Sequence, residues 1–209
     1  MKIIKFVCFF IFMTILTICT GCGEEGLLGV IDKAPISTEA KNISIHNSHS
    51  TLNIDLPFDL SNEKKPNLSG DIAPYIDNSF NKFGSNQYVA ARILGYSFDV
   101  DSINKDFGIN FNINLDNMIN AAKSNVIKLK NAENVKFDKP KDVIINDKKM
   151  THITGTYTYN DKKNSFECYV DLIIFIDGAD SWEITIIGKH DDNISKNCAK
   201  DMLNSIKFN

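Results

Sequence analysis

The sequence predicts an α+β fold, in which an antiparallel β-sheet is sandwiched by helices. Three observations indicate this class. Residues 142–188 alternate apolar and polar side chains in four runs separated by polar turns, which is typical of an antiparallel meander. Apolar side chains recur at helical spacing between residues 115 and 129. A second helical stripe closes the chain between residues 194 and 206.

Two stretches before the first helix predict strands. "TLNIDLPF" (51–58) places apolar residues at every second position and ends at Pro57. "QYVAARILGYSFDV" (87–100) is rich in β-branched and aromatic residues. "DIAPYIDNSFNKF" (71–83) is ambiguous, because Pro74 allows only a short helix. "FGINFNIN" (107–114) fits either a strand or an extended segment.

Two helices are expected. Asn114 or Asp116 is placed to cap the first one. Ser195 can cap the second. The apolar stripe of the second helix comprises Ile194, Cys198, Ala199, Met202, Leu203 and Ile206.

The phase of the meander assigns its side chains to faces. Turns are expected at residues 146–149, 160–164 and 177–180. The apolar sets that share a face within each strand are Ile153, Gly155, Tyr157 and Tyr159; Phe166, Cys168, Val170 and Leu172; and Trp182, Ile184 and Ile186.

The composition is that of a folded, mildly acidic protein. Of 209 residues, 43% are hydrophobic and 23% charged, and the formal charge is −3. Without Lys2 and Lys5, 21 basic residues face 26 acidic ones, so a processed chain carries a charge near −5. A chain with this charge balance lacks the excess of basic residues that binds the phosphates of nucleic acid, and we expect no nucleic-acid partner.

The first 22 residues predict export. Lys2 and Lys5 precede an apolar run from Phe6 to Ile18, and small residues then lead to Cys22. This resembles a bacterial lipobox, although Cys19 stands where an aliphatic residue is usual. The resemblance implies cleavage of residues 1–21 and a lipid on Cys22, which places the protein on the extracytoplasmic side of the cell membrane. The alternative is an uncleaved membrane anchor.

Residues 22–49 then predict a flexible tether, and residues 50–209 a globular domain. His46 and His49 in the tether have a spacing that could bind metal on a helical turn. No helix signal or third ligand accompanies them, so we interpret them as solvated residues of the tether and expect no metal site.

The order of elements resembles the PsbP-like family. The similarity covers residues 51–209 and rests on a strand ending in "LP", the periodic helix, "ITGTYTY", "SFECYVDLIIFIDGADSWEITIIG" and a last helix ending in "SIKF". That family includes an extrinsic photosystem subunit, a Ran-binding import factor and bacterial lipoproteins of unknown role. The resemblance implies a helix–sheet–helix sandwich and brings no catalytic residues with it.

Two cysteines remain in the domain. Cys168 and Cys198 lie on apolar faces of a strand and of the last helix. Both should point into one core, so we expect them to lie close together in space. They could form a disulfide outside the cytoplasm, or stay as two buried thiols that behave as small hydrophobes.

A polar row on the meander is the candidate binding face. His152, Thr154 and Thr156 alternate with apolar residues on one strand. Glu167, Tyr169 and Asp171 can lie across from them on the next strand. A solvated sheet face is the alternative interpretation of this row.

These features predict a non-enzymatic, lipid-anchored module that binds another surface protein or assembly. No catalytic residue and no cofactor are expected, because neither a nucleophile motif nor a phosphate-binding loop is present in the sequence. An enzyme or small-ligand receptor with a pocket beside His152 is the alternative.

Overall fold

The computed structural model describes residues 39–64, 71–161 and 164–209. The predicted signal peptide, Cys22 and residues 22–38 of the predicted tether lie outside these ranges. The strands are β1 (Lys41–His46), β2 (Thr51–Leu56), β3 (Ser61–Asn62), β4 (Ile76–Ser85), β5 (Val89–Phe98), β6 (Ala132–Phe137), β7 (Lys141–Ile145), β8 (Lys148–Asn160), β9 (Ser165–Asp177), β10 (Asp180–Lys189) and β11 (Lys207–Phe208). The helices are η2 (Ala73–Tyr75), α2 (Val100–Phe107), α3 (Leu115–Ile127) and α4 (Asn193–Ser205).

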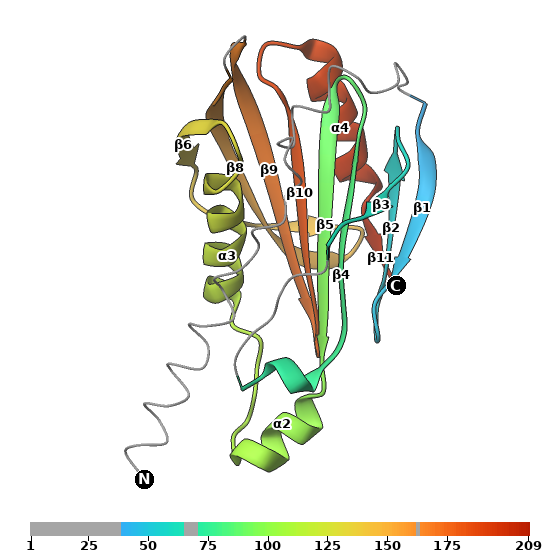
Figure 1. Ribbon diagram of the computed structural model, residues 1–209. Coiled ribbons are helices and arrows are strands. Elements are labelled where there is room, and N and C mark those ends of the chain that lie inside the picture. Colours follow the sequence, from blue (N-terminus) through green and yellow to red (C-terminus); the bar gives the residue numbers. More distant parts are fainter. Residues whose placement is uncertain (1–38, 65–70, 162–163) are drawn as a thin grey trace.

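The main sheet has eight antiparallel strands in the order β3-β4-β5-β10-β9-β8-β6, and β7 also pairs with β8 (Figure 1). The predicted meander is therefore confirmed as β7 to β10. Its tight turns place Asn146, Asp147 and Gly178 at positive φ, a conformation that Asn, Asp and Gly adopt readily in hairpin turns.

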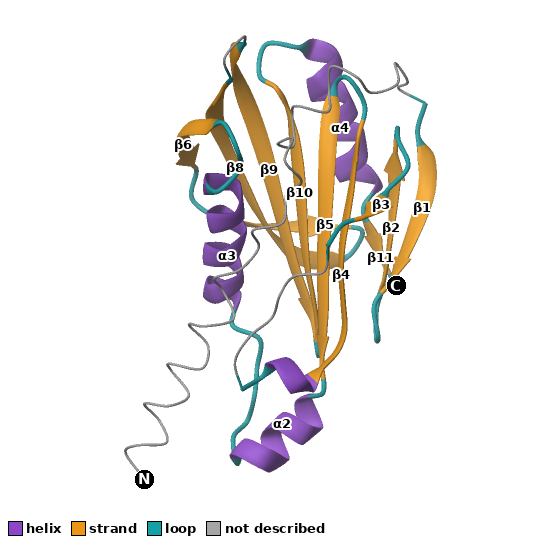
Figure 2. Ribbon diagram, viewed as in Figure 1, coloured by secondary structure: helices purple, strands orange, loops and turns teal. Residues whose placement is uncertain are grey.

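Helices cover both faces of this sheet, as expected for an α+β fold with the sheet sandwiched by helices (Figure 2). One face packs under α3, whose N-cap is Asn114 as expected, and forms a core cluster that includes Ile153, Leu172 and Val126. The other face packs under α4 and forms a second cluster around Trp182. The two clusters follow directly from the alternation of side chains along each strand.

A second, three-stranded sheet has the order β1-β2-β11 and lies on the same side of the main sheet as α4 (Figure 1). Its strand β1 corrects the prediction for residues 41–46, which lie within the span predicted as tether. Ile43 and Ile45 alternate with polar residues, and Ile45 is buried in the core. This three-residue alternation was too short to stand out against the Asn- and Ser-rich segment around it.

The sequence-based prediction also missed helix α2 and strands β3, β4, β6 and β11. Helix α2 begins after Asp99, whose side chain accepts a hydrogen bond from the Ser102 amide, and ends at Gly108 with φ of 62°. It packs at one end of the sheet on a small cluster that includes Phe98 and Ile103. The stretch 107–114 is consequently the end of α2 followed by an extended segment. The ambiguous stretch 71–83 forms the short helix η2 and most of strand β4.

The start of α4 also differs from the expectation. Asp192, rather than Ser195, caps the helix by accepting a hydrogen bond from the Ile194 amide. Ser195 instead lies in the first turn, buried, and donates to the Tyr88 carbonyl oxygen. Ile194 is 45% exposed and does not belong to the buried stripe.

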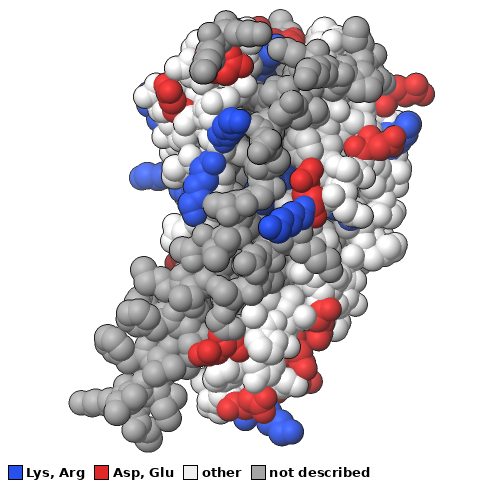
Figure 3. All heavy atoms as spheres, in the orientation of Figure 1, with Lys and Arg blue, Asp and Glu red and all other residues white. Residues whose placement is uncertain are grey.

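The described surface carries charges of both signs. On the face shown in Figure 3, acidic side chains and adjoining basic ones lie at the lower end, and charges of both signs are also interspersed higher up. In the described part of the chain, no helix is long and apolar enough to cross a bilayer.

Candidate functional site

The predicted polar row forms where β8 pairs with β9. Thr154 lies opposite Asp171, and Thr156 lies opposite Tyr169. These side chains share the sheet face that carries α4, because residues two apart in a strand point to the same side. Helix α4 packs mainly on β2, β5 and β10. The side chains of His152 and Asp171 keep 24% and 14% of their surface exposed.

A histidine–carboxylate contact lies at the centre of the row. His152 Nε2 is 2.7 Å from Asp171 Oδ1, which holds the imidazole ring by one nitrogen. Thr154 donates its hydroxyl to Asp138, and Lys141 lies opposite His152 on β7. The row therefore presents hydroxyls, an oriented imidazole and a carboxylate side by side, which together can donate and accept hydrogen bonds.

Tyr169 and Glu167 differ from the rest of the row. The Tyr169 hydroxyl donates to the Ser195 carbonyl oxygen at 2.8 Å, so this side chain supports α4. Burial raises the pKa of Tyr169, which keeps its hydroxyl protonated. Glu167 lies 3.5 Å from His190 Nδ1 at the far end of β9. The accessible part of the row is thus His152, Thr154, Thr156 and Asp171.

The predicted closeness of Cys168 and Cys198 is wrong. Cys168 lies in the core cluster under α3, whereas Cys198 packs against the cluster under α4. The main sheet separates them, and both thiols are free. The phase of β9 was predicted correctly, but α4 covers the opposite face of that strand from Cys168. Burial raises the pKa of Cys168 to about 12, so this thiol stays neutral at physiological pH.

A buried polar cluster on the α3 face had no counterpart in the prediction. Asn125 Nδ2 on α3 donates to both carboxylate oxygens of Glu183, at 3.2 and 3.1 Å. Arg92 Nε donates to Asn81 Oδ1 at 3.1 Å. Burial raises the pKa of Glu183, and the Arg92 charge and its hydrogen bonds oppose this shift. The available signal in the sequence was a charged residue in the apolar interior of each of two strands, Arg92 in β5 and Glu183 in β10.

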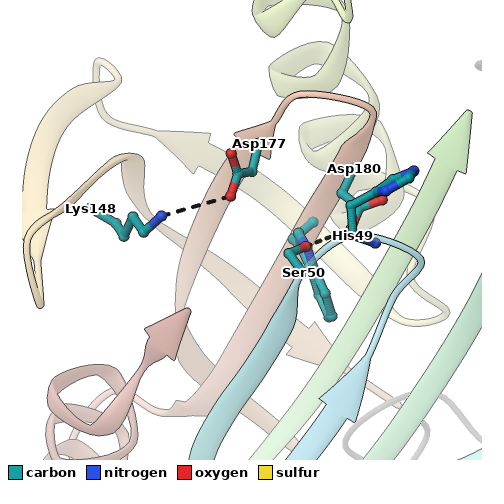
Figure 4. A network of polar contacts seen from close by, with 6 residues as sticks. His49, Ser50, Lys148, Asp177 and Asp180 are labelled. Atoms are coloured by element: carbon teal, nitrogen blue, oxygen red, sulfur yellow. Dashed lines mark hydrogen bonds and ion pairs between the residues drawn. The ribbon is translucent and has the colours of Figure 1, made fainter. Parts of the chain in front are cut away.

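A second polar network attaches the β1–β2 hairpin to the main sheet (Figure 4). Asp180 Oδ2 accepts hydrogen bonds from the His49 amide at 2.9 Å and from Ser50 Oγ at 2.6 Å. Ser50 Oγ in turn accepts from Trp182 Nε1 at 2.9 Å. Asp180, Ser50 and Trp182 are all buried. This network fixes the hairpin on the core and contributes to stability.

The two histidines of the predicted tether take structural positions. His46 Nδ1 lies 3.0 Å from the Thr51 hydroxyl across the hairpin, and His49 contributes its backbone amide to Asp180. Among residues 39–64, 71–161 and 164–209, no three His, Cys, Asp or Glu side chains are grouped as metal ligands.

A groove of about 360 Å³ lies between α4 and the end of β2, away from His152. Its lining residues are Ala40, Asp55, Pro57, Ile194, Asn197, Cys198, Asp201 and Met202. The groove thus lies at a different place from the polar row that the sequence predicted.

Comparison with known proteins gives a distant likeness to solved structures. No family model matches the chain, and no curated protein matches it. A solved structure described as LpqN, involved in cell envelope biogenesis of Mycobacterium tuberculosis, superposes with a TM-score of 0.42 and 8% identity. The match covers 81% of this chain and 91% of that one. The resemblance to the PsbP-like family stays a hypothesis.

Proposed function

We propose that this protein is a lipid-anchored, extracytoplasmic and non-enzymatic domain that binds another surface protein or assembly through the polar row on β8 and β9. The observation that carries the proposal is the His152–Asp171 contact flanked by threonine hydroxyls on a part of the sheet face that α4 leaves partly exposed.

The chemistry of the row suits protein recognition. Thr154 and Thr156 lie two residues apart on a strand, so their hydroxyls point to the same side. The Asp171 carboxylate orients His152 before any partner arrives, which lowers the entropy lost on binding. On binding, hydroxyl and imidazole groups of this kind exchange their hydrogen bonds with water for hydrogen bonds with a partner's backbone or side chains.

The anchor is proposed from sequence alone. The run Thr20, Gly21, Cys22 after an apolar segment fits a lipobox, and a lipid-modified Cys22 would hold the domain at the membrane. A binding role at the surface fits such an attachment, because both the anchored protein and its partner are then confined to the same thin layer and meet at high effective concentration.

The test compares proteins recovered with anchored variants. The wild type, Thr156→Arg on the row and Asn120→Arg on the exposed side of α3 are expressed in the native membrane, and each is isolated with its neighbours after mild cross-linking. We expect at least one protein to be recovered with the wild type and Asn120→Arg but lost with Thr156→Arg. If no protein shows this dependence, the row is not the binding face.

Hydrolysis at the histidine–carboxylate contact is a second candidate function. The observation in its favour is the 2.7 Å separation of His152 Nε2 and Asp171 Oδ1. A carboxylate also orients the histidine base in hydrolase triads, although there it contacts Nδ1 and here it contacts Nε2. An activity screen would establish this function if it found a turnover that His152→Ala abolishes and Thr158→Ala retains. A screen without such turnover would leave binding as the function.

A further inference from the structure

The groove beside α4 combines apolar walls with acidic side chains. Pro57 and Met202 form buried parts of the wall, and Ile194 leaves 45% of its surface exposed at the start of the helix. An exposed isoleucine at a concave site is available to contact the aliphatic part of a ligand.

Two carboxylates border the same space. Asp55 at the end of β2 accepts a hydrogen bond from Asn42 Nδ2 at 2.7 Å, which holds it beside the groove. Asp201 lies on the exposed side of α4 and also lines the groove. At the neighbouring thiol, burial raises the pKa of Cys198, and the charges of Asp201 and Asp192 raise it further.

The lysines of α4 do not lie on the side of the helix that lines the groove. At about 100° per residue, Ile194, Asn197, Cys198 and Asp201 fall within about 100° of arc on the helix. Lys196 and Lys200 lie outside this arc, on the far side of the helix. Lys41 is directed to Asp59 at 3.6 Å. The acidic charge of the groove is therefore not neutralised by the lysines of its own helix.

We propose that this groove binds an alkylammonium group, namely the side chain of a lysine on a partner protein. The aliphatic stem would lie along Ile194, Pro57 and Met202, and the ammonium would lie between Asp55 and Asp201. A volume of about 360 Å³ accommodates one such side chain together with part of its backbone. The inference extends the proposed function by naming the chemistry of a second contact with the partner.

The probe is Nα-acetyl-lysine N-methylamide, and its uncharged analogue is Nα-acetyl-norleucine N-methylamide. A compound of this size is expected to bind with a Kd on the order of 1 mM. The readout is the rate at which a thiol-selective methanethiosulfonate reagent modifies Cys198 in the full-length, membrane-anchored protein, measured by mass spectrometry of the Cys198 peptide. The Cys168 peptide should stay unmodified and thereby confirms that the protein remains folded.

We expect the lysine compound at 10 mM to slow the modification of Cys198 by about tenfold, and the norleucine compound at the same concentration to leave it nearly unchanged. Asp201→Asn should raise the Kd of the lysine compound by about two- to fivefold. Asp116→Asn, which removes the same charge from the exposed start of α3, should leave the Kd unchanged. Equal protection by the two compounds, or an unchanged Kd in Asp201→Asn, would overturn the proposal.

This experiment is independent of the partner experiment. Lysine binding without a Thr156-dependent partner would support the groove and refute the proposed binding face. A Thr156-dependent partner without lysine binding would refute the groove alone. Should free lysine derivatives protect Cys198 from the thiol reagent while a lysine-rich peptide does not, that result would reject a protein partner as the source of the ammonium group.

Discussion

Replacing Ser50 with alanine should release the β1–β2 hairpin from the core at a large cost in stability. The hydroxyl donates to Asp180 Oδ2 at 2.6 Å and accepts from Trp182 Nε1 at 2.9 Å. Its removal leaves the indole N–H of Trp182 buried without this acceptor. Asp180 then keeps only the His49 amide as donor to Oδ2.

The magnitude follows from the two groups affected. A buried donor left without a partner costs about 1–3 kcal/mol, and a hydrogen bond to a charged group contributes about 1.5–3 kcal/mol. Both terms arise from one hydroxyl and are not fully additive, so we expect Ser50→Ala to lower the free energy of unfolding by about 3 kcal/mol.

Urea unfolding followed by tryptophan fluorescence is the assay, because the chain has one tryptophan, Trp182, and it belongs to the network. Ser48→Ala in the same loop is the matched control, since Ser48 is exposed. The control should change stability by no more than about 0.5 kcal/mol. A loss below about 1 kcal/mol in Ser50→Ala would refute the reasoning that this network fixes the hairpin.

Three further outcomes are expected. Gly188→Ala should lower the free energy of unfolding by about 1–3 kcal/mol in urea titrations, because a Cβ there would overlap the Tyr169 hydroxyl and Ser195 Oγ. Burial raises the pKa of Glu183, so its contribution to stability is present below the ordinary carboxyl pKa and is lost as pH rises through the folded-state pKa. The stability of Glu183→Gln relative to wild type, measured by unfolding at several pH values, should therefore increase with pH. Cys22→Ser should block lipid attachment and leave the leader uncleaved, which intact-mass spectrometry will show.

Much of the fold could be predicted because its strands alternate cleanly. Strands β8, β9 and β10 follow one another through short turns, so the phase of one strand determines the faces of the next. The row from His152 to Asp171 could be found for the same reason. Strand β6 was missed because its register shifts between Glu133 and Lys136, and Asn134 has a positive φ.

The contacts that could not be predicted join distant segments. Asn125 and Glu183 are 58 residues apart, and Ser50 and Asp180 are 130 residues apart. No local pattern indicates which polar residues meet over such separations. The error with Cys198 has the same origin, because the sequence predicts an apolar stripe on the last helix but does not specify the sheet face that receives it.

Photo-cross-linking in living cells tests the central claim most directly. A photoreactive amino acid is placed at Thr156 on the polar row and, in a second strain, at Asn120 on the exposed side of α3, with the protein otherwise intact and anchored. We predict a discrete covalent adduct with another surface protein at Thr156, its loss when His152→Ala is added, and no such adduct at Asn120. Absence of an adduct at Thr156, or equal adducts at both positions, would contradict a binding function for this face.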